Sequence, residues 1–216
     1  GIMFLIIGKA CRNMKSKANM FTRIGKLCFV CALLLYVFNI YDSFMQDQSQ
    51  KQILEQYIQE NNHQQDTSLV KIPDYQLHPE MDMPEVQLPG LEGAGCIGIL
   101  EIPSINLRLP VLSTWSYALL KKAPCRYTGS VYLDNMVIAA HNSKAHFKKL
   151  SNLQEGDMIT FTDAVGNVFT YSVAGIEILQ PEEVDDMTSG QWPLTLFTCT
   201  YGGAGRVTVR CRKNIE

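Results

Sequence analysis

The chain divides into stretches that differ in their pattern of apolar and polar positions. Residues 27–41 read LCFVCALLLYVFNIY, an apolar run without a charge. Residues 42–93 are polar, rich in Gln, Asn and Glu at first and in proline later. From residue 94 onward, short runs of β-branched and aromatic residues are separated by Gly, Pro and Asn. This pattern predicts an N-terminal apolar helix, a connecting stalk and an all-β domain.

The apolar run 27–41 is slightly shorter than the roughly 20 residues that span a bilayer core. The stems of Arg23 and Lys26 can reach the interface, so the residues before the run lengthen it. A buried core helix fits poorly behind a basic flank, and IYDSFMQ offers no small-residue cleavage site for a signal peptide. We expect an uncleaved signal anchor at 27–41, a cytoplasmic tail at 1–26 and an extracellular body, which makes a single-pass protein of the cell membrane.

Charge and cysteine content narrow the function classes. Six of the 19 Lys and Arg residues lie within 1–26, whereas all 21 Asp and Glu residues follow residue 41. The acidic body lacks the basic patch that nucleic-acid binding requires, so nucleic acid is excluded as a partner. The cysteines beyond the anchor form neither a CxxC pair nor a His/Cys cluster at zinc spacing. No cofactor or metal ligand is predicted, and metal dependence and disulfide state stay open.

Residues 42–93 are predicted to form a stalk and a Pro-rich linker. Apolar residues between positions 44 and 58 recur at loosely helical spacing, so a helix would continue the anchor to about residue 65. Prolines at intervals of five or six residues between 73 and 89 exclude regular helix. They indicate an extended spacer or a strap over the following domain.

The domain at 94–216 is predicted to be all-β with minor helices. Short helices are expected at Ser116–Lys121 and His146–Leu153, and DAVGN at 163–167 is expected to form a hairpin turn. This density of strands, about eight in roughly 120 residues, is typical of a barrel or a sandwich. The predicted strands are 96–103, 105–112, 130–133, 135–141, 157–163, 168–179, 193–199 and 205–211.

Three chemically active residues stand at predicted strand ends: His141, Cys199 and Arg206. Neighbouring strands lie about 4.8 Å apart, so the three side chains could meet at one rim. A cysteine thiolate is a nucleophile, an imidazole can exchange its proton, and a guanidinium can hold a carbonyl or an oxyanion. Each also has a structural interpretation: a buried small hydrophobe, a satisfied histidine, and the exposed face of a strand that carries Arg206, Arg210 and Arg212. Spacing alone leaves these alternatives open.

The sequence around these residues resembles the sortase family. LTLFTCTYGGAGRVTVR (194–210) resembles the sortase active-site signature: a TLxTC box, a short loop and an arginine that opens the last strand. GILEIPSINLRLPV (98–111), MVIAAHN followed by HFKKL, and LQEGDMITFTDAVGNVFTYSV are similar to three further family segments in the same order. The resemblance covers about residues 94–216.

The resemblance implies an eight-stranded sortase barrel with transpeptidase activity. Cys199 would attack the Thr–Gly carbonyl of an LPxTG-like sorting signal and form a thioacyl intermediate. His141 would protonate the leaving amine and activate the incoming one, and Arg206 would steady the oxyanion. The acceptor amine would come from a peptidoglycan cross-bridge, a lipid-linked precursor or a pilin lysine. The residues expected to border the substrate groove are Thr198, Leu196, Asn142 and Tyr201.

Two other functions stay open at this point. A cysteine endopeptidase would share the thioacyl step and differ in using water as the acceptor. A tethered β-barrel binding module would need no chemistry at all. His146 is a rival to His141 as the base, but its HFKKL context is helical, so His141 keeps that role. The sortase class is also left open.

Overall fold

A computed structural model describes residues 2–64, 73–91 and 93–214. The chain forms two compact units, Gly1–Phe44 and Met45–Glu216. Helix α1 (Ile2–Gln64) runs through the first unit into the second. The segment Thr22–Asn61 of α1 is long and apolar enough to cross a membrane, and none of its most apolar window is buried. By length and composition, this helix is compatible with a single-pass anchor.

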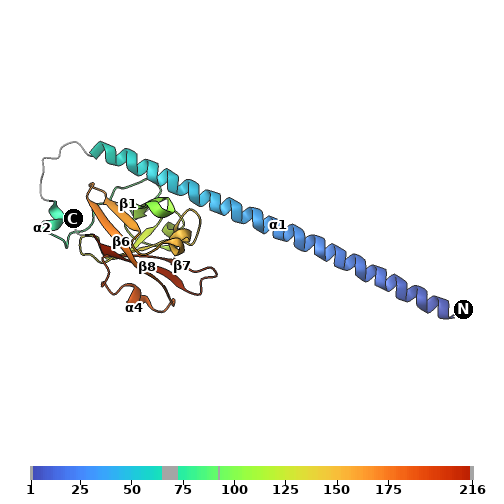
Figure 1. Ribbon diagram of the computed structural model, residues 1–216. Helices are drawn as coiled ribbons and strands as arrows, with labels where there is room; N and C mark the ends of the chain where they lie inside the picture. Colours follow the sequence, from blue (N-terminus) through green and yellow to red (C-terminus); the bar gives the residue numbers. More distant parts are fainter. Residues whose placement is uncertain (1, 65–72, 92, 215–216) are drawn as a thin grey trace. The chain divides into compact units, whose positions relative to one another are not determined.

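Over residues 93–214, eight strands close into a barrel in the order β1-β2-β3-β4-β7-β8-β6-β5, which confirms the predicted architecture. The β2–β3 and β4–β7 pairs are parallel and the other pairs are antiparallel. Strands β7 and β8 lie side by side beside β6 (Figure 1). The strands are β1 (Cys96–Ile102), β2 (Leu107–Leu112), β3 (Cys125–Thr128), β4 (Met136–Ala139), β5 (Met158–Asp163), β6 (Val168–Leu179), β7 (Leu194–Cys199) and β8 (Arg206–Lys213).

Short helices connect the strands of the barrel. The expected helices at 116–121 and 146–153 are present in shortened form, and Ser116 caps the first through its hydroxyl, which accepts from the Leu119 amide at 3.1 Å. The 163–167 hairpin turn is also confirmed, with Gly166 at a φ of 94°. The helices are α2 (Asp74–Leu77), η1 (Pro103–Ile105), α3 (Tyr117–Leu120), η2 (Phe147–Asn152) and α4 (Val184–Met187).

Alternation along β4 and β7 separates the barrel interior from an outer face. Met136, Ile138, Leu194 and Leu196 point into the main core. The side chains between them face outward, where they pack under the loop that follows β6 in a smaller cluster. That outer cluster consists of Val137, Ala139, Leu179, Met187 and Phe197. We call this side of β4, β7 and β8 the outer face.

The predicted strand at 130–133 is wrong, and β3 (Cys125–Thr128) takes its place. Gly129 and Asp134 have φ values of 73° and 51°, which turn the chain on either side of the predicted segment. The Asn135 side chain closes this turn by accepting from the Ser130 amide at 2.9 Å. The Tyr132 ring is buried in this turn, and its hydroxyl donates to the Asp163 carboxylate at 2.7 Å.

The Pro-rich segment forms a strap on the barrel, so the structure decides between the two predicted alternatives. The Tyr75 ring stacks on Tyr132 with 4.8 Å between ring centroids, and Val86 pairs with Cys96 in an antiparallel bridge. Tyr75 also contacts Phe169 near the start of β6. Two residues further along β6, Tyr171 pairs with Lys213, which is the last residue of β8. Tyr75 therefore lies roughly 20 Å or more along the strands from the beginning of β8.

Candidate active site

Strand register brings the three predicted catalytic residues to one end of the barrel. Cys199 ends β7 and pairs directly with Arg206, the first residue of β8. On the other side of β7, the parallel strand β4 pairs Ala139 with Phe197, and His141 follows two residues later, as Cys199 follows Phe197. The Thr198 hydroxyl donates to the Ala140 carbonyl at 2.8 Å, which ties the two chains together beside this pair.

The same alternation places these residues on the outer face. Cys199 follows Phe197 at a spacing of two, and His141 follows Ala139, both members of the outer cluster. Arg206 alternates with Val207, which packs against the barrel core. The thiol, the imidazole and the guanidinium therefore leave their strands on one side of the sheet.

A tight loop between β7 and β8 sets the pairing of Cys199 with Arg206. The Thr200 amide donates to the Gly205 carbonyl at 2.8 Å, and the Gly205 amide donates to the Thr200 hydroxyl at 2.9 Å. Gly202 and Gly203 have φ values of 84° and 78°, a left-handed conformation that suits glycine. The sequence TYGGAG can therefore reverse the chain within a few residues.

Burial distinguishes Cys199 from the other cysteines of the barrel. All four are free thiols, and Cys199 alone among them is half-buried while Cys96, Cys125 and Cys211 are buried. Burial raises the pKa of each of these three thiols to about 12, so they stay protonated at neutral pH. Cys199 is therefore the barrel thiol that a substrate could reach.

The histidine segment forms a compact turn after β4. The Phe147 amide donates to the His141 carbonyl at 3.0 Å, and this brings the His146 ring to a parallel position 6.1 Å from the His141 ring. His141 is half-buried and His146 is buried. The rival base therefore lies beside the predicted one, with less access to solvent.

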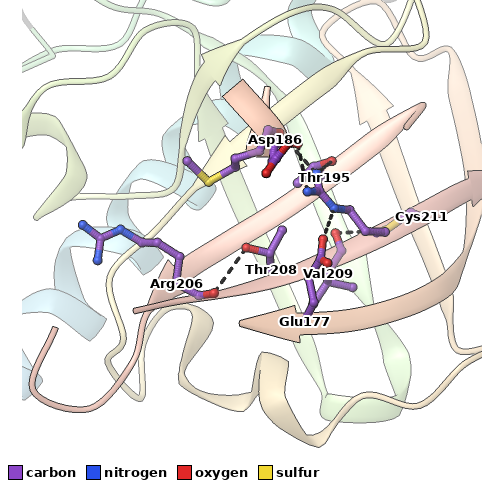
Figure 2. Close-up of polar contacts among 9 residues, drawn as sticks. Glu177, Asp186, Thr195, Arg206, Thr208, Val209 and Cys211 are labelled. Atoms are coloured by element: carbon purple, nitrogen blue, oxygen red, sulfur yellow. Dashed lines mark hydrogen bonds and ion pairs between the residues drawn. The ribbon is translucent and has the colours of Figure 1, made fainter. Parts of the chain in front are cut away.

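The arginines of β8 have different surroundings. The Arg206 guanidinium donates to the Gly205 and Gly203 carbonyls at 3.1 and 3.4 Å, so it rests against the β7–β8 loop. Figure 2 shows Arg206 pointing away from a group of polar contacts that Glu177, Asp186 and Thr195 surround. Arg212 is exposed.

The arginine at the centre of those contacts is Arg210, and its predicted place on an exposed face is wrong. Its side chain is buried and donates to Glu177 at 2.7 Å, to the carbonyls of Asp186 and Met187 at 2.9 and 3.3 Å, and to the Thr195 hydroxyl at 3.3 Å. It joins α4 to the sheet because the loop after β6 folds over β8.

A cavity of about 330 Å³ lies at the same end of the barrel as Cys199, His141 and Arg206, and direct neighbours in sequence of all three line it. Three of the four predicted groove residues, Asn142, Thr198 and Tyr201, line it, and Tyr201 is fully exposed. Leu196 does not line it, because this side chain is fully buried in the barrel core and offers no surface to a substrate. Among the described residues, no three His, Cys, Asp or Glu side chains gather to hold a metal ion.

A row of aromatic side chains that the sequence pattern did not predict lies beside the site. Tyr127 lies edge-on to Phe197, Trp115 stacks on Tyr127, and Tyr117 lies edge-on to Trp115, each with ring centroids 5.4 Å apart. Tyr117 is exposed, so the row runs from the neighbourhood of Cys199 to solvent. The run STWSY, with two aromatics in a polar loop, was the available signal.

Comparisons with known proteins show the family of this chain. The model of the Sortase domain family matches residues 100–214, more than half of the chain. The chain belongs to the sortase family. Members of this family are generally cysteine transpeptidases.

Two curated sortases are similar to this chain in sequence. The chain is 26% identical to Sortase A of Bacillus anthracis over 190 residues, covering 85% of this chain and 89% of that protein. It is 30% identical to Sortase D of Bacillus subtilis over 107 residues, covering 47% and 53%, so it spans about half of that relative.

Solved structures share the fold. A Sortase D5 transpeptidase from Clostridium perfringens matches with a TM-score of 0.58 at 20% identity, over 78% of this chain and 99% of that one. Sortase A from Corynebacterium diphtheriae matches with a TM-score of 0.52 at 18% identity, over 78% and 95%. At these identities the likeness concerns the fold.

Proposed function

We propose that this sortase is a membrane-anchored cysteine transpeptidase that cleaves an LPxTG-like sorting signal and transfers the new carboxyl end to an amine. The observation that carries the proposal is the placement of Cys199, His141 and Arg206 at one end of three adjacent strands, on one face. The accessibility of Cys199, in contrast to the buried thiols of the barrel, supports its role as the nucleophile.

In the first half-reaction, the Cys199 sulfur attacks the Thr–Gly carbonyl of the sorting signal. The carbon–sulfur bond forms, the carbon–nitrogen bond breaks, and His141 gives a proton to the leaving glycine amine. The Arg206 guanidinium stabilises the negative charge that develops on the carbonyl oxygen. For this step it must exchange its contacts with the Gly203 and Gly205 carbonyls for the substrate.

In the second half-reaction, an amine attacks the thioacyl carbonyl. His141 takes the proton from this amine, the carbon–sulfur bond breaks, and the Cys199 thiolate is regenerated with a new amide as product. The acceptor belongs to a peptidoglycan cross-bridge, a lipid-linked precursor or a pilin lysine outside the cell. The apolar helix α1 holds the chain in the cell membrane with the barrel on the extracellular side.

Asn142 and Tyr201 are proposed to contact the substrate, because both line the cavity beside the site and both are exposed. Thr198 lines the same cavity, but its hydroxyl is already bonded to the Ala140 carbonyl. We therefore assign Thr198 mainly to holding β7 against β4. Leu196 is not proposed again, because it is buried in the core.

The test is to incubate the full chain with an LPxTG peptide, with and without an added amine such as triglycine. We expect the amine to appear in the product, and we expect Cys199→Ala to remove all turnover. Arg206→Lys should lower the rate by roughly 10²-fold or more, because one ammonium cannot replace the planar guanidinium fork. Arg212→Lys, an exposed change on the same strand, and Cys31→Ala in α1 serve as matched controls with full rate.

Two results would overturn parts of the proposal. Release of cleaved peptide with no incorporation of amine at any concentration would identify an endopeptidase. Full activity of the Cys199→Ala variant would remove the thiol mechanism altogether.

A further inference from the structure

A second cavity, of about 270 Å³, lies between helix α1 and the barrel, within the Met45–Glu216 unit. Helix α1 contributes Gln50 and Leu54, the η1–β2 segment contributes residues 105–109, and the turn after His141 contributes residues 144–146 and 149. Ile53 and Tyr57, on the same side of α1, pack into a hydrophobic cluster of the barrel unit. The contact of α1 with the barrel is therefore apolar at one end and polar at this cavity.

Two buried side chains line the cavity with unused polar atoms. His146 is 1% exposed, and neither of its ring nitrogens has a hydrogen-bond partner among the described residues. Gln50 is 4% exposed, and its Nε2 is likewise unpartnered within the described part of the chain. Buried polar groups are normally bonded, so both point to a ligand that accepts hydrogen bonds.

The remaining charges of the cavity are mainly positive. Lys51 pairs with Asp47 at 2.7 Å, and Arg108 pairs with Glu101 at 2.7 Å. Among the described residues that line the cavity, Asp47 is the single acid. Two further cations, Lys144 and Lys149, come from the turn after His141, and the Lys149 ammonium donates to the Ile105 carbonyl at 3.0 Å. Donors and positive charge therefore face the cavity from α1, from β2 and from the 144–149 turn.

We propose that this cavity binds a small tetrahedral oxyanion, a free phosphate or sulfate or a phosphate monoester, through Gln50, His146 and Lys144. Gln50 comes from α1, His146 and Lys144 come from the 144–149 turn, and Arg108 adds positive charge from β2. Donors and charge that converge from three elements suit a tetrahedral group better than a planar carboxylate. The proposal concerns a site separate from Cys199 and does not depend on the proposed transpeptidase reaction.

The cavity is physically connected to the histidine of the candidate active site. The His146 ring, which lines the cavity, is parallel to the His141 ring at 6.1 Å. Burial, together with the neighbouring His141, lowers the pKa of His146 to about 4. A bound anion favours the protonated ring, so binding takes up a proton and becomes tighter as pH falls.

The other charged groups that face His146 must be considered in the same titration. They are Asp47 and Lys51 from α1, Arg108 from β2, Lys144 and Lys149 from its own turn, and His141. Because His141 is also an imidazole, a His141→Gln variant separates its effect from that of His146.

The test is calorimetric titration of the full chain, in neutral maltoside micelles and bis-Tris chloride buffer, with sulfate, which stays a dianion between pH 5.5 and 7.5. We expect the apparent affinity to increase by up to about tenfold for each unit by which pH falls in this range. His146→Gln keeps a donor but cannot carry the charge, so it should lose this pH dependence. Gln50→Met should weaken binding at every pH, and His141→Gln should keep the pH dependence.

His78→Gln is the matched control, because His78 is an exposed imidazole that does not line the cavity, and its sulfate binding should equal that of the unaltered chain. Parallel titrations with phosphate and glycerol 1-phosphate at pH 6 show whether the free ion or the monoester binds more tightly. Absence of binding for all three anions, or unaltered pH dependence in a folded His146→Gln variant, would overturn the inference. Since no turnover is measured, this failure is distinct from a failure of the proposed function.

Discussion

The buried Arg210 offers a sharp test of how the barrel holds the loop that carries α4. Replacing it by Met keeps the apolar length of the side chain and removes the guanidinium. The Asp186 and Met187 carbonyls and the Thr195 hydroxyl then lose their donor. At about 1 kcal/mol for each of these bonds, and more for a charged donor, Arg210→Met should lower the free energy of unfolding by roughly 3 kcal/mol.

Two matched variants show whether this cost comes from the buried network. Glu177→Gln weakens only the ion pair, whose carboxylate is 47% exposed, so it should cost about 1 kcal/mol or less. Arg212→Met changes an exposed arginine two residues further along β8 and should stay within about 0.5 kcal/mol of the unaltered chain.

Thermal unfolding of the full chain, followed by near-ultraviolet circular dichroism, measures these differences. A loss of 3 kcal/mol corresponds to a fall in Tm of roughly 6–12 °C for a domain of this size. If Arg210→Met lowers the Tm no further than Arg212→Met does, the network does not hold the loop and the reasoning is refuted.

Two further predictions concern stability. Burial lowers the pKa of His146 to about 4, against about 6.5 in the unfolded chain, so the unfolded state binds the proton first as pH falls. The stability contributed by neutral His146 is therefore complete above about pH 6.5 and is lost between pH 6.5 and 4. Between pH 7.5 and 4.5, the free energy of unfolding of the unaltered chain should fall by roughly 2–3 kcal/mol more than that of His146→Gln, as measured by urea titrations without added anion. An equal fall in both proteins would contradict this prediction. Gly129→Ala should destabilise by about 3 kcal/mol or more, because a Cβ would lie 2.1 Å from the Asn135 carbonyl oxygen at a φ of 73°. Gly202→Ala, at a φ of 84° with nothing within 4 Å, should cost only about 1–2 kcal/mol, and a similar Tm for both variants would count against the steric explanation.

The barrel could be predicted largely because most of its strands coincide with apolar runs in the sequence. The predictions were wrong where a strand is not mostly buried or where buried residues do not form a strand. Of the β3 residues Cys-Arg-Tyr-Thr, only Cys125 is buried, so no apolar run marks this strand. Val131 and Tyr132 are buried without being in a strand, because a turn with Gly129 and Asp134 at its ends folds them into the core.

The candidate site could be located in the sequence because its residues stand at predicted strand ends and the motifs around them resemble those of the sortase family. The surroundings of those residues depend on contacts between segments far apart in the chain. Arg210 stands between Val209 and Cys211 as an exposed arginine of a strand would, but it is buried by contacts with the α4 loop, β6 and β7. Leu196 was misplaced for a simpler reason: it lies three positions before Cys199, and strand alternation puts the two on opposite faces.

The most direct test of the transpeptidase proposal is peptide mass spectrometry of the protein caught during turnover. The full chain is mixed with an LPxTG peptide in the absence of an amine, quenched in acid and digested for mass spectrometry. We expect the peptide that contains Cys199 to gain the mass of the acyl fragment ending in threonine, and we expect no such gain in the Cys199→Ala variant. Acylation of a different cysteine, or accumulation of cleaved peptide without any adduct at Cys199, would contradict it.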